Sequence, residues 1–120
     1  MKHCIAVWGF LLSGLFIATA SVSADPTQIM LATATKGGGF ELSGSNAAAV
    51  INEVDHSVNV VAKNTKGSLE NIGLLAEGRF DLGLVQGVAA HEAFSGIGQK
   101  PVNLKVIAAI YSSPGMFVVR

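Results

Sequence analysis

Apolar and polar positions alternate in blocks along residues 25–120. Short apolar runs, typical of buried strands, take turns with stretches in which apolar residues recur at helical spacing. The predicted strands cover residues 28–33, 58–62, 80–85, 104–111 and 116–119, and the predicted helices cover residues 40–53, 68–77 and 88–94. This alternation predicts an α/β fold, in which helices pack on the faces of a parallel sheet.

The spacing of apolar residues within the first two helices predicts which side of each helix packs against the sheet. The buried positions are expected to be Leu42, Ala49, Val50 and Ile51 in the first helix, and Leu69, Ile72, Leu75 and Ala76 in the second. Gly78 follows the second helix, as glycine commonly does at a helix C-terminus. Residues 95–98 and 112–115 are expected to form a loop and a turn.

Residues 1–24 differ from the rest of the chain. A short basic start precedes an apolar run that ends in the small residues Val22-Ser23-Ala24. This order is typical of a secretory signal peptide, with cleavage after Ala24. A single membrane anchor is the alternative, but the run is barely long enough to span a bilayer. We therefore predict a periplasmic protein, in which residues 25–120 form one small domain.

The composition of the chain argues against several classes of function. Cys4 is the only cysteine and lies in the predicted signal peptide, so no disulfide or thiol chemistry is expected after it. Basic and acidic residues are equal in number, at eight each, and form no basic stripe, which argues against binding of nucleic acid. His56 and His91 lack the spacing of metal ligands. We expect no catalytic activity, no metal and no cofactor.

Three loops follow the predicted strands at their carboxyl ends, where parallel sheets place ligands. The first spans residues 33–40 and contains three consecutive glycines, which permit positive φ and let backbone N–H groups approach an anion closely. The second spans residues 64–68. The third begins at Gln86, whose amide can donate to a carboxylate.

Each loop also has a plain structural interpretation. The glycines can form a flexible turn, Thr65 or Ser68 can cap a helix, and Gln86 can bond loop backbone. Nucleotide-binding motifs are excluded, because no Gly-Lys-Ser/Thr follows the glycines. In addition, Leu42 stands where the dinucleotide motif requires a third glycine.

The order and spacing of several segments resemble the TAXI family of solute-binding receptors, which serve TRAP transporters. The resemblance extends from Ile29 to Arg120. It rests on residues 32–39, Val50-Ile51-Asn52, Thr65-Lys66-Gly67-Ser68 with Glu70-Asn71, Phe80-Asp81-Leu82-Gly83-Leu84-Val85-Gln86, and residues 111–120.

The resemblance implies a type II-like periplasmic-binding-protein fold, with two α/β lobes and a ligand cleft between them. It also implies capture of a small anionic solute, such as glutamate or another amino acid or a dicarboxylate, and delivery to an integral-membrane TRAP permease. Because Arg120 falls about where such a receptor leaves its first lobe, we expect a truncated, N-terminal portion. The ligand-binding candidates carried over by position are Thr35, Gly37, Gly38, Gly39, Phe40, Ser68 and Gln86.

The chain departs from the family at Gly39, at Glu41 and at Gly87-Val88, where a hydroxyl residue, a second aromatic residue and Ser-Asp are usual. These exchanges leave the identity of the ligand open. Two other classes of function also stay open: a stand-alone secreted interaction or immunogenic domain without transport activity, and an enzyme on the same fold, because a fold does not dictate function.

Overall fold

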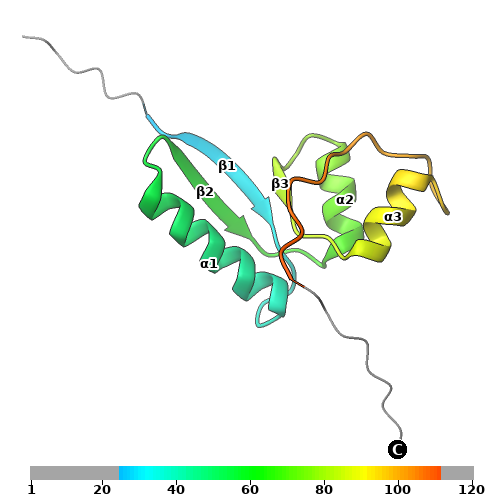
Figure 1. Cartoon of the computed structure of the whole chain (residues 1–120), viewed down its shortest axis with the longest axis horizontal. Coiled ribbons are helices and arrows are strands. Elements are labelled where there is room, and N and C mark those ends of the chain that lie inside the picture. Colours follow the sequence, from blue (N-terminus) through cyan, green and yellow to red (C-terminus); the bar gives the residue numbers. More distant parts are fainter. Residues whose placement is uncertain (1–24, 112–120) are drawn as a thin grey trace, which may run out of the picture.

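A computed structural model describes residues 25–111, which form a small sheet with helices packed around it (Figure 1). The predicted signal peptide, the turn at 112–115 and the strand at 116–119 lie outside the described residues. The elements, in chain order, are β1 (Thr27–Ala32), α1 (Gly39–Val54), β2 (Val58–Lys63), α2 (Ser68–Ala76), β3 (Leu82–Gly83) and α3 (Gly87–Ser95). The predicted alternation of strands and helices is therefore confirmed for this part of the chain.

The sheet is parallel, as predicted, and its order is β2-β1-β3. β1 pairs along its whole length with β2, from Thr27 opposite Val58 to Ala32 opposite Lys63. Its pairing with β3 is limited to two residues. β3 is therefore much shorter than the strand predicted for residues 80–85.

The two faces of the sheet carry different helices. Leu82 packs in the cluster of Leu31, Ala48 and Val60 beneath α1. The next residue, Gly83, faces Leu75 of α2 instead. Because successive residues of a strand point to opposite faces, α1 and α2 cover opposite sides of the sheet. α3 packs beside α2 through a second cluster, formed by Ile72, Ala89 and Ala93.

The predicted buried side of α1 is wrong. Leu42, Ala49, Val50 and Ile51 are exposed, and the buried residues are Gly44 and Ala48. These two small residues lie one turn apart, so α1 approaches the sheet along a narrow stripe that larger side chains would hold away. A Cβ atom at Gly44 would lie 2.5 Å from the Thr33 methyl group, which shows how close this approach is.

The prediction for α2 is confirmed in part. Ile72 is buried and Leu75 is half-buried, but Leu69 and Ala76 are exposed. Asn71 and Leu74 take their places on the buried side. The buried positions are thus rotated from the predicted ones, because α2 packs against both β3 and α3. Gly78 adopts a positive φ of 67° just after the helix, as predicted.

Residues 104–111 do not form the predicted strand. A strand needs a neighbour that accepts and donates backbone hydrogen bonds, and within residues 25–111 no such bond joins this segment to the sheet. Val106, Ile107 and Ile110 therefore remain exposed. No helix within residues 25–111 is long and apolar enough to cross a membrane.

Candidate functional site

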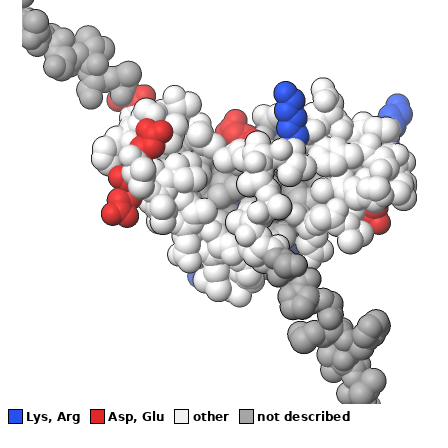
Figure 2. Space-filling model, in the orientation of Figure 1, with Lys and Arg blue, Asp and Glu red and all other residues white. Residues whose placement is uncertain are grey.

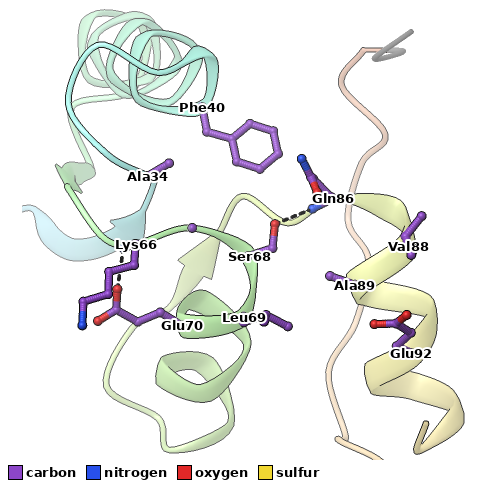
Figure 3. A pocket seen from close by; sticks show the side chains of 11 residues that line it. Ala34, Phe40, Lys66, Ser68, Leu69, Glu70, Gln86, Val88, Ala89 and Glu92 are labelled. Carbon is purple, nitrogen blue, oxygen red and sulfur yellow. Dashed lines mark hydrogen bonds between the residues drawn. The ribbon is translucent and has the colours of Figure 1, made fainter. Parts of the chain in front are cut away.

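A pocket of about 700 Å³ lies at the edge of the sheet where the three strands end (Figure 3). α1 contributes Phe40 from one side, and the first turns of α2 and α3 form the others. The lining residues are Ala34, Phe40, Lys66, Gly67, Ser68, Leu69, Glu70, Gln86, Val88, Ala89 and Glu92. The pocket thus lies where parallel sheets commonly bind ligands.

Ser68 and Gln86 join the second and third loops across the pocket. The Gln86 backbone N–H donates to the Ser68 Oγ over 3.0 Å, a bond drawn as a dashed line in Figure 3. The serine hydroxyl acts here as an acceptor and keeps its own proton for a further bond. Neither residue provides a side-chain cap for its helix, so both polar side chains are available at the pocket.

Asn71 forms hydrogen bonds that connect the segments around the pocket. The sequence pattern did not identify it as a functional residue. Its side chain is fully buried, at 0% exposure. Its Nδ2 donates to the carbonyl oxygens of Thr33 and Leu84, each over 2.7 Å, and its Oδ1 accepts from the Thr65 hydroxyl at 2.6 Å. One amide therefore ties together the carboxyl-terminal ends of β1 and β3 and the loop before α2.

A sequence signal for Asn71 did exist. Asn71 is an uncharged polar residue directly before the apolar residues Ile72, Leu74 and Leu75, and a polar side chain beside such a run is typically hydrogen-bonded to neighbouring backbone when it is buried. Its partners could not be read from the sequence, because Thr33, Leu84 and Thr65 lie on separate elements.

The three helix N-termini differ in their charge. Glu41 lies in the first turn of α1 and accepts a hydrogen bond from the Gly37 N–H over 3.3 Å. Glu70 has the same place in α2 and accepts from the Lys66 N–H. The first turn of α3 contains no acidic residue. Among the helices of residues 25–111, α3 is therefore the one whose positive dipole end is not offset by its own carboxylate.

The structure brings only some of the predicted ligand-binding residues together. Phe40, Ser68 and Gln86 line the pocket. Gly39 lines a neighbouring groove instead. The remaining candidates, Thr35, Gly37 and Gly38, are not among the residues that line either space.

The glycine loop uses part of its polar backbone internally. The Gly38 N–H donates to the Thr35 carbonyl oxygen over 3.0 Å, which closes a turn. Gly37 has a positive φ of 84°, so glycine is needed there for conformation. The local structure of this loop thus accounts for Gly37 by its conformation and for the Gly38 N–H by the turn, without a ligand.

The neighbouring groove is larger and mostly apolar. It encloses about 1210 Å³ between α1, β3, α3 and residues 104–111. Tyr111 lines this groove and meets Phe40 edge-to-face, with ring centroids 6.3 Å apart. Phe40 lines both spaces and therefore lies between the pocket and this apolar groove.

Charged side chains are few around these spaces. On the face that Figure 2 shows, basic side chains stand apart from one another and form no patch. This face therefore lacks the continuous basic surface that binding of nucleic acid requires.

Comparison with known proteins agrees with the fold. A search among curated proteins gave no match. The model of the NMT1-like family, which is of the periplasmic-binding-protein type, matches residues 31–120. This match includes β1 from Leu31 on, the other described strands and helices, and all the residues that line the pocket. The chain therefore belongs to the NMT1-like family, whose type of fold supports a solute-binding role.

Proposed function

We propose that this protein is the solute-binding component of a TRAP transporter of the TAXI kind. Residues 1–24 would export it to the periplasm, where it captures a small organic carboxylate, an amino acid or a dicarboxylate, and passes it to a membrane permease. The protein acts by binding and has no catalytic step. Membership of the NMT1-like family and the resemblance to TAXI receptors both support this proposal.

The start of α3 is the observation that carries the proposal. The N–H groups of Gly87, Val88 and Ala89 lie in the first turn and point away from the body of the helix. No first-turn carboxylate offsets them, so a carboxylate from outside is favoured there. Gln86 and Ser68 stand beside these groups and can donate further hydrogen bonds.

Binding by the full chain tests the proposal. We expect saturable heat release when L-glutamate or succinate is titrated into the protein. Gln86→Ala should weaken binding by about tenfold, the usual loss for one hydrogen bond to a charged group. Thr35→Ala is the control, because Thr35 is exposed and does not line the pocket. The absence of saturable binding for every small carboxylate would refute the proposal.

The same pair of variants decides between the two candidate loops. If Thr35→Ala weakens binding and Gln86→Ala does not, the glycine loop holds the ligand instead of α3. A substitution at Gly38 is less suitable for this purpose. A Cβ atom there would lie 3.0 Å from the Thr35 carbonyl oxygen, so the turn itself would change.

One observation favours a second candidate function, a secreted interaction domain. Val106, Ile107 and Ile110 are exposed beside the apolar groove, and Ile107 reaches 79% exposure. Clusters of exposed apolar side chains commonly mark protein contacts. A stable complex with a macromolecule, together with no binding of small carboxylates, would favour this function over the transport role.

A further inference from the structure

The charged side chains that line the pocket include both signs. Lys66 lies just before α2, and Glu92 lies on α3. Glu70, the third charged residue of the lining, already accepts the Lys66 N–H. Lys66 and Glu70 give the α2 side both signs, whereas Glu92 is the charged side chain that α3 contributes to the lining.

Glu92 is placed to meet a ligand. It is half-buried and lines the pocket, and its carboxylate has no hydrogen-bond or ion-pair partner among residues 25–111. Figure 3 shows this carboxylate turned from α3 toward α2. A carboxylate that lines the pocket without such a partner can pair with a cationic group of a ligand.

The spacing of Glu92 and Gly87 along α3 gives an approximate length for the ligand. Glu92 follows Gly87 by five residues, which corresponds to about 7.5 Å along the helix axis. Val88 and Ala89 lie between them on the same side of α3, since residues three and four apart share a helix face. Their side chains are apolar.

The middle of the pocket is apolar on its other sides as well. Phe40 projects into it from α1, and Leu69 faces it from α2. Leu69 and Val88 are 75% and 72% exposed, so both offer apolar surface that a ligand could cover. A chain of methylene groups would gain from this burial, whereas a polar chain would not.

We infer that the pocket selects a solute with a carboxylate at one end, an ammonium group at the other and a short methylene chain between them. The carboxylate lies at the first turn of α3, the methylene chain packs on Phe40, Leu69 and Val88, and the ammonium group pairs with Glu92. Glu92 is then the residue that excludes dicarboxylates of the same length. This inference rests on the proposed function and narrows its class of solute.

Three compounds of equal chain length test the inference. 5-Aminopentanoate, glutarate and pentanoate share the carboxylate and differ only in the group at the far end. In calorimetric titrations of the full chain, we expect 5-aminopentanoate to bind about tenfold more tightly than pentanoate, as for one charged hydrogen bond. Glutarate should bind more weakly than both, because two carboxylates would face each other.

Glu92→Gln provides the decisive comparison. It should remove the preference for 5-aminopentanoate and improve glutarate binding relative to the parent, with little change for pentanoate. Glu53→Gln is the matched control, because Glu53 is exposed on α1 and does not line the pocket. Thermal unfolding of both variants checks that the fold is kept.

The possible results distinguish a failure of this inference from a failure of the proposed function. If the parent binds glutarate as tightly as 5-aminopentanoate, the inference is overturned while the proposed function stands. If the parent prefers 5-aminopentanoate and Glu92→Gln keeps that preference, the role of Glu92 is overturned. If none of the three compounds, nor L-glutamate or succinate, binds the parent, the proposed function fails and the inference fails with it.

Discussion

Replacement of Asn71 by leucine should destabilise the protein more than almost any other change of similar size. The substitution removes the bonds to the Thr33 and Leu84 carbonyl oxygens and the bond from the Thr65 hydroxyl. Each bond contributes about 1 kcal/mol net to folding. The Thr65 hydroxyl can turn to the Thr33 carbonyl oxygen, which lies 3.2 Å away, so part of the loss is recovered.

The Leu84 carbonyl oxygen is the group that loses most. This acceptor is part-buried. Leaving it without a partner costs about 1–3 kcal/mol, while the added apolar surface of leucine offsets about 1 kcal/mol. The expected net loss is about 3 kcal/mol, against a total stability of about 5–15 kcal/mol for a small domain. Urea unfolding followed by circular dichroism measures this difference.

Two further variants test whether the hydrogen bonds of Asn71 cause this loss of stability. Asn46→Leu changes an exposed asparagine of α1 and should shift the free energy of unfolding by less than about 0.5 kcal/mol. Asn71→Asp keeps the acceptor for Thr65 but places a carboxylate against two carbonyl oxygens. Burial and these oxygens would raise the pKa of the introduced carboxyl in the folded state above its unfolded value of about 3.9.

The sign of the pH dependence follows from that raised pKa. The folded state of Asn71→Asp binds its proton more tightly, so its stability is highest below the unfolded pKa and falls as the pH rises through the folded pKa. Asn71→Leu introduces no titrating group and should show no such fall. A free energy of unfolding for Asn71→Leu within about 0.5 kcal/mol of the parent value would be no larger than the effect of an ordinary surface substitution. Asn71 would then not hold the strand ends together.

Two other predictions concern residues outside the pocket. Gly44→Ala should destabilise the protein by about 1–2 kcal/mol, because the new methyl group meets the buried Thr33 side chain at 2.5 Å. In Gly73→Ala, the new methyl group on α2 has no neighbour within 4 Å, so this variant should stabilise the protein by about 0.5–1 kcal/mol. Urea unfolding should therefore give changes in the free energy of unfolding of opposite sign for the two variants. Changes of the same sign would mean that α1 does not approach the sheet closely at Gly44. The Ser57 hydroxyl and N–H hold the pKa of Asp55 below its ordinary value, so Ser57→Ala should raise that pKa in an NMR titration. Because the pKa of Asp55 is lowered by folding, its carboxylate stabilises the protein above the unfolded pKa, and this stabilisation is lost as the pH falls through the folded pKa. Ser57→Ala should therefore lose less stability than the parent over this acidic range.

The elements of the fold were predictable because each depends on local pattern. The apolar run at β1 and the glycine after α2 predict a strand and a helix end by themselves. The strand predicted for residues 104–111 is absent because strand formation also depends on non-local contacts. An apolar run becomes a strand only if another strand stands beside it, and sequence pattern carries no information about that neighbour.

The candidate site was predictable in its position and only partly in its members. The rule for parallel sheets places the ligand where the strands end, and Phe40, Ser68 and Gln86 meet there. Glu92 was missed because it lies on a helix, beyond the loops in which ligands were expected. That it faces the pocket depends on how α3 packs against α2.

The sequence by itself determined the α/β class, the order of the elements and the edge of the sheet at which a ligand should bind. These features follow from hydrophobic periodicity and from the connection of strands through helices, which act along the chain. Only the tertiary structure decided that Gly44 and Ala48 face the sheet, that Asn71 joins two strands and a loop, and that α3 offers the free helix terminus. Those features depend on contacts between residues far apart in the sequence, for which local pattern sets no geometry.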